Sequence, residues 1–174
     1  MNPAAEPIRE SGTASSEQLA QEAIERLTAA GQTLAVAESL TGGLVAAALT
    51  TVAGSSAAFR GGIVAYATEL KTALLGVPAD LLAAHGPVYD EVAEAMALGV
   101  RDRLGAAYGL GTTGVAGPGP ADGHPAGTVF IAVAGRLGSQ TQGLSLGGDR
   151  YEVRAQTVQS ALSLLVRALR EDQD

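Results

Sequence analysis

The sequence predicts an α/β fold, namely a single-domain, three-layer α/β/α sandwich with a mixed β-sheet. Segments of helical periodicity alternate with apolar runs that are too short to form helices, which favours strands joined by crossover helices. Near the end of the chain two apolar runs, 128–134 and 140–146, follow each other directly, which favours adjacent strands. The length of 174 residues fits one domain, expected over residues 16–174 after a disordered leader at 1–15.

Local signals mark where the first elements begin and end. Ser15 and Gln18 form a capping-box pattern for a helix that Gly31 can end. The apolar run at 33–37 is predicted to be a buried strand, and a helix is expected after it at 43–51. The remaining elements are expected, in order, as a strand at 62–67, helices at 68–76, 78–85 and 90–108, strands at 108–113, 128–134 and 140–146, and a terminal helix at 149–169.

Composition excludes several classes of function. The formal net charge of −7 argues against a general electrostatic grip on nucleic acid, and the absence of cysteine excludes disulfides, zinc–thiolate sites and thiol nucleophiles. His85 and His124 are the only histidines and show no ligand spacing, so no metal site is expected. No apolar run approaches the roughly 20 residues that span a bilayer, and residues 1–16 lack the apolar core of a secretory signal. A cytoplasmic protein that binds no membrane is therefore expected.

The segment Glu-Ser-Leu-Thr-Gly-Gly at 38–43 lies between a predicted strand and a predicted helix. Its backbone N–H groups, together with the hydroxyls of Ser39 and Thr41, could hold a phosphate at the helix N-terminus. The alternative is an ordinary strand-to-helix turn in which Ser39 or Thr41 caps the helix. The segment is neither a Walker loop nor a dinucleotide fingerprint.

A second group of residues suggests nucleophilic catalysis. Gly54, Ser55 and Ser56 form a turn with two hydroxyls, and Lys71 is the only lysine of the chain. A serine that lacks a histidine or carboxylate base can be activated by a deprotonated lysine, which requires that burial or nearby cations lower the lysine pKa. The alternatives are ordinary turn chemistry and a solvated helix lysine.

Three further residues, a tyrosine and two arginines, lie near these motifs in the predicted fold. Tyr66 and Lys71 are five residues apart, which differs from the Tyr-x-x-x-Lys spacing of short-chain dehydrogenases and argues against that class. Arg150, at the start of the last predicted helix, could bind an anion or merely be solvated there. Arg154 lies one helical turn further on and could share that task.

The motifs AESLTGG, AGSS, FRGGIVAYATELK, TTGVAGP and GGDR, in this order, resemble those of the CinA carboxy-terminal domain family, the nicotinamide-mononucleotide deamidases. The resemblance runs from about Leu19 to the end of the chain. Tyr89 stands where members commonly have a serine, and His124 where they have a lysine. The resemblance implies a free-standing domain without the amino-terminal nucleotide-processing domain of many members.

The resemblance also implies an activity and a site. The activity is hydrolysis of the carboxamide of nicotinamide mononucleotide (NMN) to nicotinate mononucleotide and ammonia, with no metal or organic cofactor, by a homodimer. By motif position the catalytic residues would be the nucleophile Ser56, the base Lys71, Tyr66 and Thr113. The substrate-binding residues would be Ser39, Thr41, Gly42, Gly43, Gly54, Ser55 and Arg150, with the turn at 54–56 supplying N–H groups to the oxyanion.

Two alternatives to this function stay open from the sequence. One is a non-catalytic module that binds a nucleotide or a protein partner in a competence or DNA-damage response. The other is an amidase that acts on a different pyridine or amino-sugar amide. Ligand binding without ammonia release would favour the first, and comparison of nicotinamide, its riboside and its mononucleotide would address the second.

Overall fold

The computed structural model describes residues 14–172. Most of the expected leader, 1–15, lies outside the described residues, but its last two residues make hydrogen bonds to the rest of the domain. Ser15 caps the first helix through a capping box, as the sequence predicts, and the Ala14 carbonyl accepts a bond from Gln159. The elements are α1 (Ser16–Ala29), β1 (Leu34–Glu38), α2 (Leu44–Thr51), the short 3₁₀ helix η1 (Ser55–Ala57), β2 (Phe59–Val64), α3 (Thr68–Leu75), α4 (Ala79–His85), α5 (Asp90–Arg103), β3 (Tyr108–Gly114), β4 (Thr128–Gly135), β5 (Gly138–Ser145) and α6 (Arg150–Glu171).

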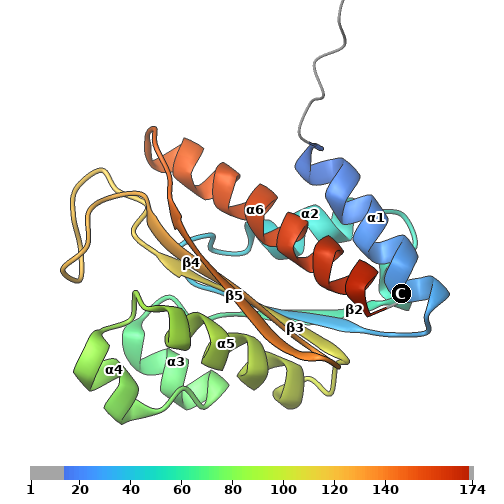
Figure 1. Ribbon diagram of the computed structural model, residues 1–174, viewed down its shortest axis with the longest axis horizontal. Helices are drawn as coiled ribbons and strands as arrows, with labels where there is room; N and C mark the ends of the chain where they lie inside the picture. Colours follow the sequence, from blue (N-terminus) through green and yellow to red (C-terminus); the bar gives the residue numbers. More distant parts are fainter. Residues whose placement is uncertain (1–13, 173–174) are drawn as a thin grey trace, which may run out of the picture.

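The strands form one mixed sheet in the order β2-β1-β3-β4-β5. β1 pairs in parallel with β2 and β3, whereas β4 is antiparallel to β3 and to β5. In Figure 1, α1, α2 and α6 cover one face of the sheet and α3, α4 and α5 lie on the other. The predicted three-layer α/β/α sandwich with a mixed sheet is therefore confirmed.

The strand directions bring several connecting segments to one edge of the sheet. β1, β2, β3 and β5 all run the same way, so the residues after each of them lie at the same edge, together with the loop from β3 to β4. In open α/β sheets, ligands bind at the carboxyl ends of the strands. Ser39, Tyr66, Thr113 and the start of α6 all belong to this edge.

Two apolar clusters, the largest of three among residues 14–172, hold the layers together. The larger packs α1, α2 and α6 against one sheet face, and the smaller packs α3 and α5 against the other. In the smaller cluster the helices come close because Gly99 of α5 has no side chain: a Cβ there would overlap the carbonyl oxygen of Leu75 in α3. The position of α3 relative to the sheet therefore depends on a glycine in α5.

The structure shifts two predicted boundaries. β2 begins at Phe59 and ends at Val64, three residues earlier at each end than the strand expected at 62–67. The start was placed too late because Gly61, which lies inside the edge strand, resembles a turn residue in the sequence. Tyr66 therefore follows the strand and does not belong to it. α5 ends at Arg103, before Gly105 adopts a left-handed φ of 59°, so the helix expected at 90–108 is shorter. Among residues 14–172, no helix is both long and apolar enough to span a membrane.

Candidate active site

The loop from β1 to α2 is fixed by a buried carboxylate at its start. Glu38, the last residue of β1, is 1% exposed, and its carboxylate accepts N–H bonds from Gly43 (3.0 Å), Val45 (3.1 Å) and Ala46 (2.9 Å). Glu38 thereby satisfies the free N–H groups of the first turn of α2 and places a negative charge at the positive end of the helix. Gly43 enters that turn with a left-handed φ of 105°. The N-terminus of α2 is therefore occupied by the protein's own carboxylate.

Other bonds hold the middle of the same loop. Arg154 of α6 donates from Nε to the carbonyl of Leu40 (3.0 Å) and from Nη2 to that of Thr41 (3.1 Å). The Thr41 hydroxyl shares a buried 2.8 Å hydrogen bond with the Thr112 hydroxyl, and the Ser39 N–H donates to the Thr112 carbonyl at 3.1 Å. The backbone on both sides of Ser39 is therefore anchored to β3 and α6.

Lys71 of α3 reaches the Ser39 hydroxyl. Its side chain is 1% exposed, and Nζ donates to Ser39 Oγ at 3.0 Å and to the carbonyl of Ala65 at 2.8 Å. Burial lowers the pKa of Lys71, while the negative charges of Asp122 and Glu69 act in the opposite direction. A buried lysine with a lowered pKa, within hydrogen-bond distance of a serine hydroxyl, has the geometry of a nucleophile and its general base.

A second set of hydrogen bonds joins α6 to the segment that follows β2 and to the β3–β4 loop. Arg150 donates from Nη2 to the Tyr66 hydroxyl (2.8 Å) and from Nη1 to the Gly117 carbonyl (2.8 Å). Tyr66 is 57% exposed, and it pairs with Arg150, with no hydrogen bond to Lys71. These bonds use two of the five guanidinium N–H donors, so the side chain can still bind an anion.

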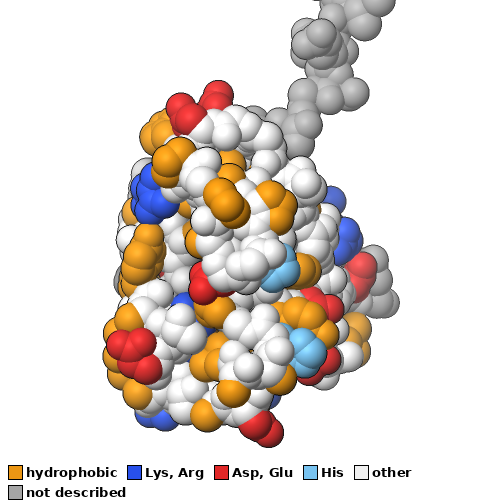
Figure 2. Space-filling view, turned by 90° about the vertical axis from the view of Figure 1, so that its left-hand side faces the viewer, with side chains coloured by type: hydrophobic (Ala, Val, Ile, Leu, Met, Phe, Trp, Pro, Cys, Tyr) orange, Lys and Arg blue, Asp and Glu red, His pale blue; other side chains and the backbone are white. Residues whose placement is uncertain are grey.

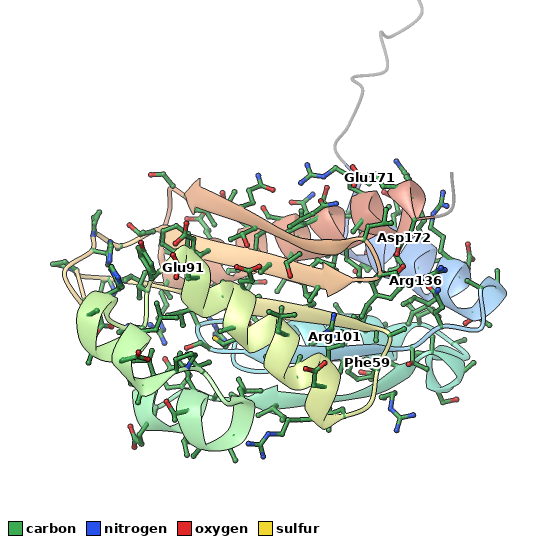
Figure 3. All side chains as sticks on the ribbon, turned by 60° about the horizontal axis from the view of Figure 1, so that its bottom comes forward. Phe59, Glu91, Arg101, Arg136, Glu171 and Asp172 are labelled. Carbon is green, nitrogen blue, oxygen red and sulfur yellow. The ribbon has the colours of Figure 1, made fainter. Side chains whose placement is uncertain are left out.

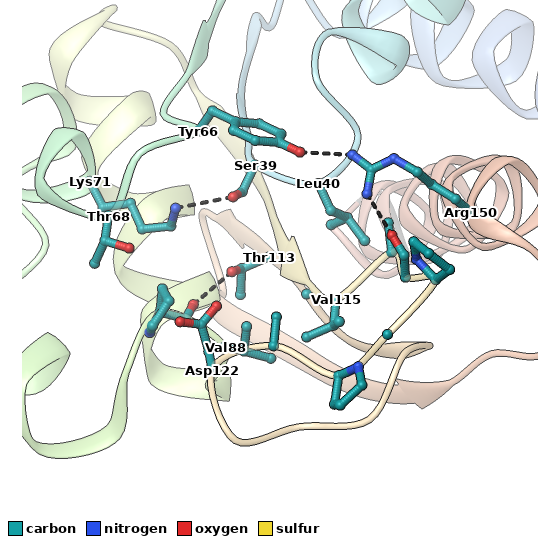
Figure 4. A pocket seen from close by; sticks show the side chains of 18 residues that line it. Ser39, Leu40, Tyr66, Thr68, Lys71, Val88, Thr113, Val115, Asp122 and Arg150 are labelled. Atoms are coloured by element: carbon teal, nitrogen blue, oxygen red, sulfur yellow. Dashed lines mark hydrogen bonds between the residues drawn. The ribbon is translucent and has the colours of Figure 1, made fainter.

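These residues line a cavity of about 410 Å³ at the carboxyl edge of the sheet. Figure 4 shows Lys71 and Ser39 on one side, Arg150 across from them, Tyr66 next to Ser39 with its hydroxyl pointing to Arg150, and Asp122 of the β3–β4 loop near Thr113. Thr113 does not bond to Lys71; its hydroxyl donates to the Pro87 carbonyl at 2.7 Å. The remaining lining residues are mainly apolar or glycine. A cavity of this size matches a small molecule.

The surface around this end carries mixed charge. Figure 2 faces it and shows basic, acidic and hydrophobic side chains interspersed, with no continuous basic area on that face. Within residues 14–172, no group of three His, Asp or Glu side chains is placed to hold a metal ion.

The structure brings together part of the predicted site. Ser39, Lys71, Tyr66, Thr113 and Arg150 all line the cavity. The predicted binding residues Thr41, Gly42 and Gly43 do not line it and serve the loop itself, and the alternative interpretation of this segment as a strand-to-helix turn describes them better. Gly54, Ser55 and Ser56 are also outside the cavity.

The pairing of Ser56 with Lys71 is not found. Ser56 is exposed in η1, before β2 begins, whereas Lys71 follows the end of β2. The first residue of β2, Phe59, pairs with Leu34 at the start of β1, and Ser39 lies five residues further along, about 16 Å from that end. Figure 3 shows Phe59 at one end of the sheet and Glu91, which is near the start of α5, at the opposite end. The turn at 54–56 is therefore at the wrong edge to supply either the nucleophile or oxyanion donors.

Three functional side chains were missed or misassigned from the sequence. Arg154 was a candidate for anion binding, but its guanidinium is engaged by the carbonyls of Leu40 and Thr41. The role of Glu38 could have been predicted from the sequence, since an acidic residue just ahead of a helix N-terminus commonly caps that helix. The position of Asp122 could not have been predicted, because the sequence around a loop aspartate does not indicate which cavity the side chain faces.

Comparisons with known proteins agree on one family. The family model described as the CinA C-terminal domain matches residues 16–169. A CinA-like protein of Frankia casuarinae is 59% identical over 137 residues, covering 79% of this chain and 32% of that protein. A CinA-like protein of Anaeromyxobacter dehalogenans is 51% identical over 148 residues, covering 84% of this chain and 36% of the relative. The chain thus spans about a third of the length of these curated relatives.

Solved structures give the same result for the fold. A competence-damaged protein (CinA) superfamily protein from Enterobacter cloacae superposes with a TM-score of 0.91 at 30% identity, covering 96% of this chain and 99% of the other. The competence/damage inducible protein CihA from Agrobacterium tumefaciens has a TM-score of 0.85 at 38% identity, covering 92% and 99%. The similarity therefore covers nearly all of the described sandwich.

Proposed function

The chain belongs to the CinA C-terminal domain family, and from this premise we propose that it is an amidohydrolase that converts NMN to nicotinate mononucleotide and ammonia. The observation that carries the proposal is the 3.0 Å contact between Lys71 Nζ and Ser39 Oγ inside the cavity. Ser39 takes the role predicted for Ser56, because of these two serines it is Ser39 that lies within hydrogen-bond distance of the lysine.

The proposed reaction has two stages. Ser39 Oγ attacks the carboxamide carbon while Lys71 Nζ accepts the hydroxyl proton, which gives a tetrahedral intermediate. Lys71 then donates that proton to the departing nitrogen, the C–N bond breaks, and ammonia leaves an acyl-serine. Water, deprotonated by Lys71, attacks the ester carbon, and the proton returns to Ser39 Oγ as the carboxylate product is released.

Backbone geometry suggests where the oxyanion would be stabilised. Leu40 lines the cavity directly after Ser39, and its N–H makes no hydrogen bond within residues 14–172. In hydrolases with a nucleophile on a strand-to-helix turn, the N–H of the next residue commonly contributes to the oxyanion hole. We assign the same role to the Leu40 N–H, which the Arg154 bond to the Leu40 carbonyl would help to orient.

Arg150 would bind the phosphate of the mononucleotide. It is held across the cavity from Lys71 by Tyr66 and Gly117, and its remaining donors suit a planar, bidentate contact with phosphate oxygens. In this pose the carboxamide lies near Ser39. Thr113, whose hydroxyl is bound to the Pro87 carbonyl, would shape the wall beside the carboxamide.

Ammonia release tests the proposal. Wild-type protein, Ser39→Ala, Lys71→Ala and Ser56→Ala are each incubated with NMN, nicotinamide riboside and nicotinamide. We expect release from NMN only, with a loss of at least about 10³-fold in Ser39→Ala and Lys71→Ala and little change in Ser56→Ala. Circular dichroism checks that each variant is folded.

The outcomes separate the alternatives. Release that does not depend on the phosphate would favour an amidase for a different amide, and binding of NMN without release by wild-type protein would favour a non-catalytic module. Full activity of Ser39→Ala would overturn the Ser39–Lys71 mechanism. We also propose action as a cytoplasmic homodimer without a cofactor, and light scattering of the purified protein tests the dimer.

A further inference from the structure

The cavity contains one acidic side chain that the mechanism does not use. Its charged lining residues are Lys71, Arg150 and Asp122. Lys71 and Arg150 are engaged by Ser39, Ala65, Tyr66 and Gly117, but the Asp122 carboxylate makes no hydrogen bond or ion pair within residues 14–172. An unpaired carboxylate on the wall of a small-molecule cavity is available to interact with the ligand.

The loop holds Asp122 in a defined conformation. Ala121 and His124 exchange both backbone hydrogen bonds, at 3.0 and 2.9 Å, around a two-residue turn formed by Asp122 and Gly123. Both turn residues have left-handed φ angles, 51° for Asp122 and 79° for Gly123, as in a type I′ turn. The carboxylate thus sits at the tip of a tight hairpin and not on an unstructured loop.

Asp122 lies on the side of the cavity where the reaction is proposed to take place. Figure 4 shows Asp122 on the side of Thr113 and Lys71, with Arg150 across the cavity. Its negative charge acts on the pKa of Lys71 in the direction opposite to burial, which has the larger effect. The cavity therefore has an acidic side near Lys71 and Ser39 and a basic side at Arg150.

We propose that Asp122 is a specificity-determining residue that selects substrates whose ring carries a positive charge next to the scissile carboxamide. This inference rests on the proposed function. NMN is such a molecule, since its pyridinium ring is cationic and its phosphate anionic, whereas reduced NMN has the same carboxamide and phosphate on a neutral dihydropyridine ring. With the phosphate at Arg150 and the carboxamide at Ser39, the cationic ring lies beside Asp122.

The test compares the two ring charges in two variants. Asp122→Asn removes the charge and keeps the turn, because Asn-Gly suits the type I′ conformation. Glu69→Gln is the matched control, since Glu69 also acts on the charge of Lys71 but lies outside the cavity lining. Dissociation constants for NMN and reduced NMN are measured by calorimetry in a Ser39→Ala background, so that neither ligand is consumed.

We expect Asp122→Asn to weaken binding of NMN by about 3- to 10-fold while leaving reduced NMN unchanged, as suits a charge pair that is partly exposed to solvent. Glu69→Gln should leave the ratio of the two constants as it is. An unchanged ratio in Asp122→Asn, or an equal change in both variants, would overturn the inference. Failure of the proposed function would be seen separately, as absence of ammonia release from NMN by the protein with Ser39 intact.

Discussion

Replacement of Glu38 by Gln should destabilise the protein more than a charge change on its surface. The Glu38 carboxylate accepts three N–H bonds, two at Oε2 and one at Oε1. The Gln amide can keep at most the two bonds at one oxygen, and its NH₂ group then faces the third N–H. Hydrogen bonds to charged groups contribute about 1.5–3 kcal/mol and neutral ones about 0.5–1.5, so the two retained bonds lose about 2 kcal/mol together. The unsatisfied N–H adds about 1–3 kcal/mol.

The expected total is therefore about 3–5 kcal/mol of unfolding free energy. Urea unfolding measures it, and Glu22→Gln is the control, because Glu22 pairs with Arg26 and Arg170 at the surface, where such pairs contribute about 0–1 kcal/mol. Ammonia release at a temperature where Glu38→Gln is folded should also fall, because Ser39 directly follows Glu38. A loss of stability in Glu38→Gln no larger than that in Glu22→Gln would refute the reasoning.

Three other outcomes are expected. Because burial lowers the pKa of Lys71, ammonia release should rise as pH passes through that lowered pKa and level off below the ordinary pKa of a lysine. The free energy of unfolding should fall as pH drops from the ordinary lysine pKa to the lowered one, because the unfolded state binds the proton first. Lys71→Met should abolish activity and remove this pH dependence in urea titrations at several pH values. Arg154→Ala should lower kcat about 10- to 100-fold by releasing the carbonyls beside Ser39, whereas Arg167→Ala, an exposed change on the same helix, should not. Gly99→Ala should cost about 1–3 kcal/mol by overlap with the Leu75 carbonyl, while Gly147→Ala, which has no neighbour within 4 Å, should be nearly neutral in thermal unfolding.

Local sequence signals were sufficient for most of the fold. The capping box at Ser15 and most of the short apolar runs lie where the structure has a helix start and strands, and the last helix begins next to Asp149 as expected. The start of β2 was missed because Gly61, inside this edge strand, resembles a turn residue in the sequence. Its pairing with β1 is a tertiary interaction that local propensity does not encode.

The choice between serines required topology and not only motif spacing. Ser56 precedes β2 and Lys71 follows it, so any strand between them must hold them at opposite edges of the sheet. Ser39 follows β1, which is parallel to β2, and so reaches the same edge as Lys71. Strand direction in the sequence-based prediction already contained this distinction, whereas the contact of Asp122 with the cavity depends on the path of a loop that no periodicity describes.

The Ser39–Lys71 contact depends on two supports that are physically independent. Ser39 is fixed by the charged groups on either side of it, Glu38 towards α2 and Arg154 towards α6. Lys71 arrives on α3, whose position is set by apolar packing against α5 at Gly99. Burial of an amine is unfavourable for the charged form, so the packing that holds α3 must also offset the cost of keeping Lys71 out of water. Changes at Glu38 or Arg154 should therefore move the nucleophile and lower kcat at every pH, whereas loosening of α3 should let water reach Lys71, raise its pKa and shift the pH profile upward.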